Sequence, residues 1–438
     1  MSSVATSAEV AALDEIDLHR IEHWQNDGYP WADWARLRRH APVYWYEREG
    51  IDPAWMITRH AEVKAVSADS SHFVNSGPQL RYASQDYNRR ARTARERKAE
   101  LHGWDADAAD DMIYLDAPDH TKLRLLTARS FTPARCRAMA ATLERHATAI
   151  VADFERALDQ RGTVDLVGEL AVKLPLATIC SLLGLPDGDW ADIHRWTDAM
   201  FDVDTMRWAQ PGEDRRAMRK RLHGEFHRYI DAVIADKRAR PADDLATALV
   251  HATVDGDPLD HQELHGYLKL LISGGNETTR NATSRGILAL LDRPDQIALL
   301  QAEPERVVPT AVDEVVRFTS PVIQFVRTAT QDRVVGGQVI RAGEMVVLWY
   351  PSANRDEAAF ADPDRLDITR DPNDHVGFGH GPHFCLGANL ARWELRAIFD
   401  ALARARTLER LEVAGPPRWL TDLHVGAIAE IDVRRSEG

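Results

Sequence analysis

The chain has 438 residues, of which 44% are hydrophobic, and its formal net charge is -14 at pH 7. That acidic balance argues against general binding to nucleic acids or anionic membranes. No apolar run is long enough to span a bilayer, and the first 20 residues lack the basic start and apolar middle of a signal peptide. We therefore expect a cytoplasmic protein.

The chain carries no sign of a division into domains. No Gly/Ser linker, internal repeat or low-complexity segment interrupts it, so residues 21–438 are predicted to form one domain behind a flexible segment at residues 1–20. Apolar residues recur mostly at helical spacing. Short strand-like runs occur near both ends, at "PVYWY" (42–46), "AWMIT" (54–58) and "EMVVLWY" (344–350). The expected fold is mainly α with small β-sheets.

A strongly charged stretch follows the first strand-like runs. The basic run Asn88–Lys98 is followed closely by the acidic run Asp105–Asp111. Opposite charges so close in sequence favour a solvated loop or helix face over a docking site for an anionic partner.

Two pairs of charged residues then occur at helical spacing. His120 and Arg124 stand four residues apart, and Glu314 and Arg317 three apart. Each pair therefore shares one face of a predicted helix. Such a pair on a surface contributes only a few tenths of a kcal/mol, so neither pair by itself indicates a function.

Between these pairs runs a long apolar helix with an unusual centre, "LKLLISGGNETTRNATSRGILALL" (268–291). Two adjacent glycines cost roughly 1 kcal/mol each relative to alanine, and a threonine can bond a carbonyl one turn back. Such a local cost often marks a functional site. Taken alone, the pattern favours a plainer interpretation, with Glu277 as a surface carboxylate paired with Arg280 or Arg285 and Thr278 as part of the helix interior.

The chain has only three cysteines, Cys136, Cys180 and Cys385, which are far apart and form no Cys-x-x-Cys pair, so a disulfide framework is not expected. Cys385 lies in the glycine-rich loop "FGHGPHFCLGANLAR" (378–392), at the start of a predicted helix. The helix dipole and nearby N–H groups favour the thiolate there.

Three roles are open for this cysteine. It fits an axial ligand to haem iron, because flanking glycines allow close approach of a flat group and donate N–H bonds to sulfur. A zinc site with His380 and His383 would lack an evident fourth ligand. An inert buried cysteine is the plain alternative, which the surrounding glycine pattern disfavours.

The loop is similar to the haem-binding loop of the cytochrome P450 family, Phe-x-x-Gly-x-x-x-Cys-x-Gly, whose fixed positions are filled here by Phe378, Gly381, Cys385 and Gly387. Residues 274–278 resemble the same family's oxygen-activating helix. The resemblance runs from about residue 116 to the end of the chain, in four ordered segments. It implies a single-domain cytochrome P450 fold.

The resemblance also implies roles for individual residues. Haem b would be bound with Cys385 as its axial thiolate, and Glu277 and Thr278 would help pass protons to bound dioxygen. Glu314 and Arg317 would form a structural network with Arg365. The remaining haem-binding positions carried over from the family, four of them for the propionates, are His120, Arg124, Arg327, His383, Phe378 and Gly387.

The implied activity is hydroxylation of a hydrophobic small molecule by O2. Two electrons would come from a ferredoxin and a ferredoxin reductase, since no dinucleotide-binding turn or cysteine cluster indicates a fused reductase. Arg392 and Arg396 would supply positive charge for docking the ferredoxin. The motifs are most similar to bacterial members that oxidise sterols, terpenoids and methyl-branched lipids. Two alternatives stay open: a peroxide-using haem-thiolate enzyme, which commonly lacks the acid–alcohol pair, and a non-catalytic haem-binding sensor.

By the same analogy, the substrate-contacting residues are expected in five segments of mostly small or apolar side chains. The charged stretch before Asp105 is longer than a compact loop and is expected to form a lid. The five segments are residues 77–112, Leu270, 273–274, 322–326 and 425–427.

Overall fold

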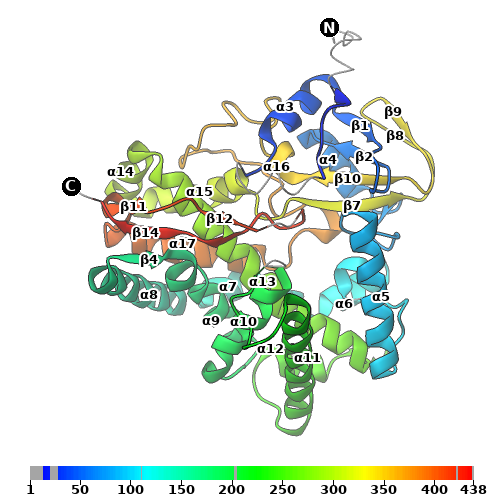
Figure 1. Cartoon of the computed structure of the whole chain (residues 1–438), viewed down its shortest axis with the longest axis horizontal. Coiled ribbons are helices and arrows are strands. Elements are labelled where there is room, and N and C mark those ends of the chain that lie inside the picture. Colours follow the sequence, from blue (N-terminus) through cyan, green and yellow to red (C-terminus); the bar gives the residue numbers. More distant parts are fainter. Residues whose placement is uncertain (1–12, 20–27, 110, 202–204, 421–422, 437–438) are drawn as a thin grey trace.

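The computed structural model describes residues 13–19, 28–109, 111–201, 205–420 and 423–436. Helices dominate it (Figure 1), which confirms the predicted fold class. The helices are α3 (Trp31–His40), α4 (His60–Ala68), α5 (Gln85–His102), α6 (Asp119–Ala128), α7 (Pro133–Ala138), α8 (Ala140–Arg161), α9 (Lys173–Leu182), α10 (Trp190–Phe201), α11 (Arg215–Ala239), α12 (Leu245–Val250), α13 (His261–Leu291), α14 (Pro294–Ala302), α15 (Pro304–Thr319), α16 (Tyr350–Ala353) and α17 (Ala388–Arg404).

The strands form one five-stranded sheet and several smaller sheets. The large sheet has the order β1-β2-β10-β7-β3, in which only the β2–β10 pair is parallel. The three strand-like runs of the sequence supply β1, β2 and β10. The strands are β1 (Val43–Tyr46), β2 (Ala54–Ile57), β3 (Phe73–Val74), β4 (Thr163–Asp165), β5 (Thr253–Val254), β6 (Asp257–Pro258), β7 (Gln324–Ala329), β8 (Arg333–Val335), β9 (Gln338–Ile340), β10 (Met345–Trp349), β11 (Leu411–Val413), β12 (Arg418–Trp419), β13 (Ile428–Glu430) and β14 (Asp432–Arg435).

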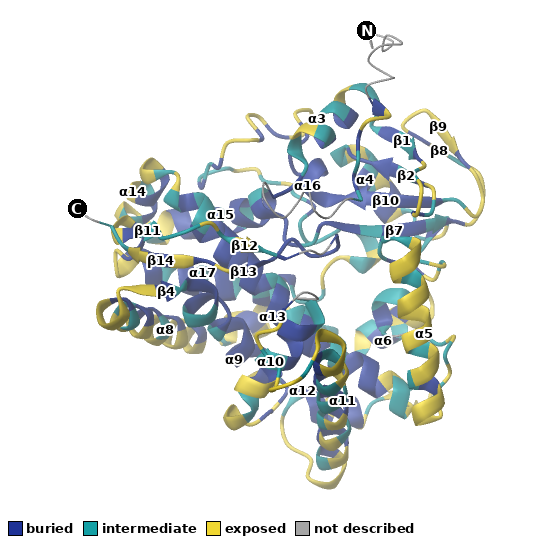
Figure 2. Cartoon of the chain, in the orientation of Figure 1, coloured by how far each residue is buried: buried dark blue, intermediate teal, exposed yellow. Residues whose placement is uncertain are grey.

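Helix α13 runs through the middle of the molecule. Its start is fixed by a capping box, in which the Asp260 side chain accepts from the N–H of Glu263 and the Glu263 side chain accepts from the N–H of Asp260. It packs against α9, α15 and α17 and is buried along most of its length (Figure 2). A helix buried in this way can present residues to an internal site while its neighbours hold it in place.

Helix α17 starts immediately after the cysteine loop and packs against α8 and α15. Its apolar face, with Leu395, Ile398 and Leu402, lies in the largest hydrophobic cluster of the described residues. This packing anchors one end of the loop that carries Cys385.

Residues 13–19 of the N-terminal segment, which was expected to be flexible, are packed against the rest of the fold. Leu13, Ile16 and Leu18 are buried against the large sheet's hydrophobic cluster, and the N–H of Leu18 donates to the hydroxyl of Tyr46 over 3.0 Å. Residues 1–12 and residue 20 of this predicted segment lie outside the described residues.

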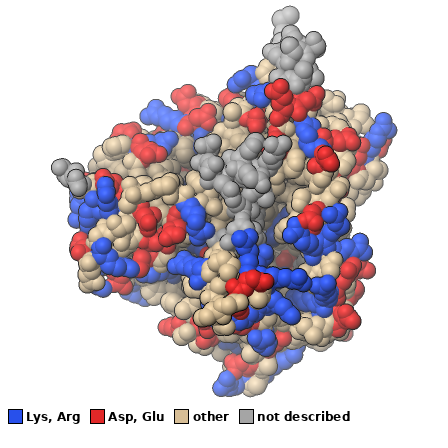
Figure 3. Space-filling view, in the orientation of Figure 1, with Lys and Arg blue, Asp and Glu red and all other residues tan. Residues whose placement is uncertain are grey.

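The charged stretch at residues 88–98 lies on α5, an exposed helix in which only Ala99 is buried. Ser84 caps its start through the N–H of Tyr87, and Gly103, with φ of 66°, ends it in the left-handed conformation. Lys and Arg side chains gather on the surface around α5 and α11 (Figure 3). The prediction of a solvated helix face is therefore confirmed, and half of the segment expected to contact substrate, residues 77–112, is instead this solvent-exposed helix.

Among the described helices, none is both long enough and apolar enough to cross a bilayer.

A buried ion-pair network joins α15 to the chain that leads into the cysteine loop. Arg317 donates to both carboxylate oxygens of Glu314, over 2.7 and 2.8 Å, and both side chains are fully buried. The predicted third member, Arg365, contributes only its backbone carbonyl, at 3.2 Å from Arg317 Nη2. The second arginine side chain that reaches Glu314 is that of Arg370, whose Nε lies 3.1 Å from Oε2. The assignment of Arg365 as the partner side chain was therefore wrong.

Removing one partner from this pair should destabilise the protein strongly. Glu314→Gln leaves the Arg317 guanidinium buried without its counter-charge, and we expect the free energy of unfolding to fall by about 3–5 kcal/mol. Denaturant unfolding of the haem-loaded protein measures this change. Asp400→Asn is the matched control, because the Asp400–Arg404 pair is solvent-exposed and should contribute less than about 1 kcal/mol. Equal effects of the two substitutions would contradict a structural role for the buried network.

Candidate active site

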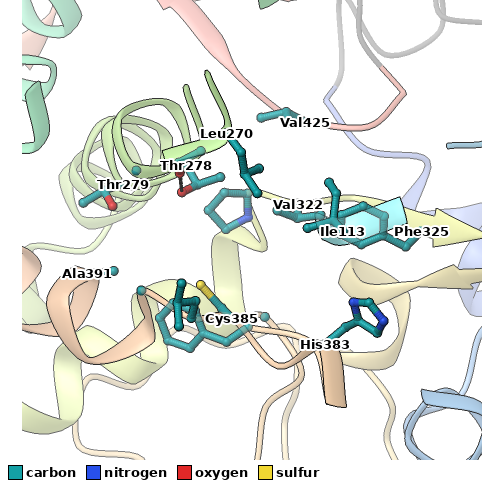
Figure 4. Close-up of a pocket in the computed structure, with 18 of the residues that line it drawn as sticks. Ile113, Leu270, Thr278, Thr279, Val322, Phe325, His383, Cys385, Ala391 and Val425 are labelled. Atoms are coloured by element: carbon teal, nitrogen blue, oxygen red, sulfur yellow. Dashed lines mark hydrogen bonds between the residues drawn. The ribbon is translucent and has the colours of Figure 1, made fainter. Parts of the chain in front are cut away.

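A cavity of about 280 Å³ lies between α13 and the cysteine loop. In Figure 4, Cys385 projects from the loop into this space, and Thr278 and Thr279 lie on the helix across from it. Leu270, Val322, Phe325 and Val425 close the cavity farther from the loop. The cavity thus has a thiol on one wall and a helix with hydroxyl groups on the other.

Cys385 is held by its own loop. Its N–H donates to the carbonyl of Phe378 over 2.9 Å, and the neighbouring carbonyl of Phe384 accepts from Arg124 Nη2 over 2.6 Å. The Cys385 side chain is enclosed by protein yet accessible from the cavity. Cys136 on α7 and Cys180 on α9 are instead buried in a separate hydrophobic cluster, which also includes residues of α10, α11 and α13. Of the three cysteines, only Cys385 therefore faces the cavity.

The environment of the Cys385 thiol combines opposing effects. Burial raises the pKa of the thiol, whereas N–H groups of Gly387 and Ala388 and the charges of Arg124 and Arg392 lower it. Burial is the largest effect, so the net direction is upward, against the expectation from the helix start alone. A thiol with thiolate-stabilising donors but a raised pKa is suited to a metal cation, because coordination deprotonates it.

Glycines shape the loop beneath the cavity. Gly379 and Gly381 both have φ of 72°, and a Cβ on Gly381 would lie 2.3 Å from the backbone oxygen of Ser67. By contrast, a Cβ on Gly387 would meet no atom within 4 Å, although Gly387 lines the cavity. The backbone beside Cys385 therefore leaves room for a flat group to approach.

The four residues predicted to bind propionates, His120, Arg124, Arg327 and His383, all line the cavity. The rings of His120 and His383 stack with centroids 3.9 Å apart. Burial, followed by the His120, Arg327 and Arg124 charges, lowers the pKa of His383 to about 3. Burial is also the main cause of the lowered pKa of Arg327. Two of the four residues, His120 and Arg327, are buried, and a group of cationic and N–H donors around one cavity is suited to an anionic ligand.

The predicted catalytic pair is divided between two environments. Thr278 lines the cavity, and its hydroxyl donates to the carbonyl of Gly274 over 2.9 Å. Glu277, next to it on α13, is fully buried outside the cavity wall. The two residues are adjacent in the chain but do not point into the same space.

Glu277 belongs to a buried charged network rather than to the surface. Its carboxylate accepts from Arg280, and Arg280 Nη1 lies 3.3 Å from Asp198 Oδ1 on α10. Asn281 Nδ2 donates to Glu277 Oε1 over 3.0 Å. Burial raises the pKa of Glu277 despite the opposing charge of Arg280. The plain expectation of a surface carboxylate was therefore wrong about exposure, although its pairing with Arg280 is confirmed.

Residues 79–418 match the protein-family model described as Cytochrome P450. The chain belongs to the cytochrome P450 family. It is 36% identical to linalool 8-monooxygenase of Pseudomonas putida, over 91% of this chain and 94% of that protein. It is 37% identical to a methyl-branched lipid omega-hydroxylase of Mycobacterium bovis, over 90% and 88% of the two chains. A Mycobacterium marinum cytochrome P450 solved in complex with pseudoionone superposes with a TM-score of 0.83 at 36% identity, covering 96% of this chain and 98% of that one.

Family membership determines the reaction class. The protein is a cytochrome P450 monooxygenase, which binds haem through a cysteine thiolate and uses dioxygen, a hydrophobic substrate and electrons from a partner. The cavity fits haem, because it offers one facing thiol, an open approach beside Gly387 and a group of cationic donors for two carboxylates.

The cavity wall away from Cys385 agrees in part with the segments expected to contact substrate. Of the described residues in the segment 77–112, only Arg81 and Met112 line it, while the other four segments each contribute at least one residue. Three apolar side chains that the sequence did not predict, Ile113, Ile179 and Phe201, also line the cavity. These lie on segments whose sequence carries no motif, so their position depends on how α9, α10 and the chain before α6 pack.

The two arginines expected to attract a ferredoxin are both partly buried. Arg392 Nε lies 2.7 Å from Asp313 Oδ1, and its guanidinium lies over the Phe378 ring, 4.6 Å from the centroid. Arg396 lies over the Trp393 ring at 5.2 Å. Much of their charge is therefore engaged within the protein.

Proposed function

We propose that Cys385 is the axial ligand of haem b and that the protein uses this haem to hydroxylate an acyclic, methyl-branched hydrophobic molecule. The ligand assignment rests on one observation: Cys385 faces the cavity. His120, Arg124, Arg327 and His383 would hold the two propionates through charge-assisted hydrogen bonds. When bound through a thiolate, haem supplies the reductive activation of dioxygen and the cleavage of its O–O bond.

Phe378 and Gly387 would shape the haem pocket around the ligand. The backbone carbonyl of Phe378 accepts a hydrogen bond from the N–H of Cys385, and the guanidinium of Arg392 covers one side of the Phe378 ring. Gly387 leaves the open space that a side chain would fill. These two residues would therefore position the thiolate and admit the flat cofactor.

The proposed proton supply uses the divided pair on α13. The Thr278 hydroxyl, in the cavity wall, would orient dioxygen and water, and Glu277 would hold a proton immediately behind it. Burial raises the pKa of Glu277, so more of its protonated form is retained near neutral pH than in an exposed glutamate. A carboxylic acid adjacent to a hydroxyl is a suitable general acid acting through water.

Removing the Thr278 hydroxyl should uncouple electron use from product formation. Thr278→Val keeps the branched shape but cannot donate a hydrogen bond, and we expect at least about a tenfold drop in product formed per NAD(P)H consumed. Substrate depletion and NAD(P)H oxidation measured together give this ratio. Thr278→Ser restores the hydroxyl and should recover most of it. Unchanged coupling in Thr278→Val would contradict the proposed role.

The substrate class rests on the cavity wall and on the relatives. Leu270, Val322, Phe325 and Val425 present apolar surface across from the haem-binding loop. Linalool, pseudoionone and methyl-branched lipids, which appear in the descriptions of similar proteins, share an open chain with methyl branches. An apolar wall with few polar groups suits such a molecule.

Electrons are proposed to come from a ferredoxin and its reductase. The sequence has no dinucleotide-binding turn and no cysteine cluster for an iron–sulfur centre, which favours electron supply from separate proteins. Because Arg392 is paired with Asp313, other surface charges are expected to contribute most of the attraction to an acidic ferredoxin.

A titration of the haem-loaded protein tests the substrate class. We expect the ferric Soret band to shift on addition of acyclic terpenoids or methyl-branched fatty acids, because these ligands would fill the cavity beside Cys385. Steroids, straight-chain fatty acids and bicyclic terpenoids form the comparison panel. Shifts with steroids alone would contradict the acyclic assignment while leaving the haem assignment intact.

A further inference from the structure

A cluster of histidines lies outside the haem cavity, where α11 meets α13. His227 and Asp231 stand at i, i+4 on α11, and His261 and His265 stand at i, i+4 on α13. One ligand atom from each of His227, Asp231 and His265 lies within 4.8 Å of the others. Two helices thus present ligand pairs to each other at helical spacing.

The inner histidines have buried nitrogens that the fold leaves unused. His265 is 2% exposed and His227 9% exposed. Within the described part of the chain, Nε2 of each ring is buried without a hydrogen-bond partner. A buried unpartnered nitrogen carries a free-energy penalty that a ligand would remove, and the two rings that carry such nitrogens lie with their centroids 3.9 Å apart.

We propose that His227, Asp231 and His265 form a binding site for a divalent transition-metal ion of the zinc class. Two imidazoles and one carboxylate are a common protein ligand set for zinc, with water in the fourth position. In a tetrahedral site with bonds of about 2.0–2.1 Å, the ligand atoms lie about 3.4 Å apart. Ligand atoms that already lie within 4.8 Å of one another would have to come closer by at most about 1.4 Å to reach that separation.

Neighbouring side chains hold the three ligands in place. His261 Nε2 lies 2.9 Å from Asp231 Oδ1, which orients the carboxylate toward the cluster. The ring of Trp104 stacks on His227 with centroids 4.9 Å apart and meets His265 edge-on at 5.1 Å.

Two lysines face the cluster, and their charge works against a bound cation. Lys98 on α5 lies over the Trp104 ring, 4.6 Å from its centroid, and Lys269 on α13 is close enough to lower the pKa of His265. Zinc binding depends mainly on coordination bonds, and sites made of histidines alone hold the ion without a carboxylate. The lysines would weaken binding without preventing it.

A bound ion would join α11 to α13 near the start of the helix that also lines the haem cavity. His265 precedes Leu270, in the cavity wall, by little more than one helical turn. The ion would thereby hold one edge of the substrate cavity. This site is independent of the proposed substrate and of haem ligation.

Metal analysis of the haem-loaded protein tests the site. Chelator-treated protein is equilibrated with low-micromolar zinc chloride, returned to metal-free buffer, and assayed for zinc and iron by mass spectrometry. We expect one zinc per haem iron in the unmodified protein. His146→Gln, which alters an exposed histidine on α8, should match it. His265→Gln and His227→Gln should each weaken zinc binding at least about tenfold, with an unchanged Soret band showing that the fold is intact.

Two results would overturn the proposal. One is the absence of bound zinc in the unmodified protein, and the other is zinc content unaffected by both substitutions. X-ray absorption at the zinc edge adds an independent readout, in which nitrogen and oxygen neighbours are expected and sulfur neighbours would place the ion elsewhere. Zinc should also raise the thermal midpoint of the unmodified protein and of His146→Gln, but not of His265→Gln.

Discussion

Cys385→Ala should abolish monooxygenase activity and the spectral signature of thiolate-bound haem. The substitution removes the one thiol among the described residues that line the cavity, and none of the neighbouring donors can supply the electron density of a thiolate to the iron. The reduced carbon monoxide complex should therefore lose its thiolate-type Soret band, and substrate turnover should fall below detection. Haem content, measured in parallel, separates loss of ligation from loss of the cofactor.

The chain offers two matched controls for that experiment. Burial raises the pKa of Cys136 to about 11 and that of Cys180 to about 12, so both remain neutral thiols within the hydrophobic cluster. Cys136→Ala and Cys180→Ala should keep the thiolate-type spectrum and most of the activity. A thiolate-type spectrum in Cys385→Ala would contradict the ligand assignment.

Glu394→Gln should make the protein more stable at alkaline pH and flatten its stability between pH 5 and 8. Glu394, on α17, is 3% exposed, and burial raises its pKa to about 8, with only the hydroxyls of Thr178 and Thr279 opposing the shift. Between its ordinary pKa and about 8, the folded protein therefore binds a proton that the unfolded chain has released. Stability falls as pH rises through that window, by up to about 5 kcal/mol.

Glutamine keeps the hydrogen-bonding shape of the protonated acid but cannot ionise. Urea unfolding of the haem-loaded protein at pH 6, 7, 8 and 9 should show that the free energy of unfolding of the variant increases relative to that of the unmodified protein as pH rises. Glu144→Gln, at an exposed position on α8, is the control and should run parallel to the unmodified protein. Parallel curves for Glu394→Gln as well would show that Glu394 ionises in the folded protein at its ordinary pKa.

The parts of the site carried by contiguous sequence could be predicted. The cysteine loop and the centre of α13 are each set by local backbone requirements: glycines at Gly379 and Gly381 where φ is positive, and a threonine that bonds a carbonyl one turn back. Because those requirements act within a few residues, the amino-acid sequence alone indicates the local structure.

Long-range pairing could not be predicted in the same way. Arg365 and Arg370 lie close together in the sequence, so either could be the partner of Glu314. Only the path of the chain after α16 brings the side chain of Arg370 to the Glu314 carboxylate. The exposure of Glu277 was misjudged for a related reason, since α10 covers it and supplies Asp198 to its partner Arg280.

The histidine cluster shows a signal that sequence reasoning missed. His227 with Asp231, and His261 with His265, each have helical i, i+4 spacing, but at least 30 residues separate the two pairs. Each pair alone is common on helix surfaces. Only the packing of α11 on α13 brings them together.

Oxygen-isotope labelling tests the central claim most directly. The purified haem-loaded protein is supplied with an acyclic methyl-branched substrate, a ferredoxin, its reductase and NAD(P)H under 18O2. The account predicts a hydroxylated product that carries one 18O atom and forms only when dioxygen and the electron donors are both present. Product that forms with peroxide alone, or that carries oxygen from water, would contradict it.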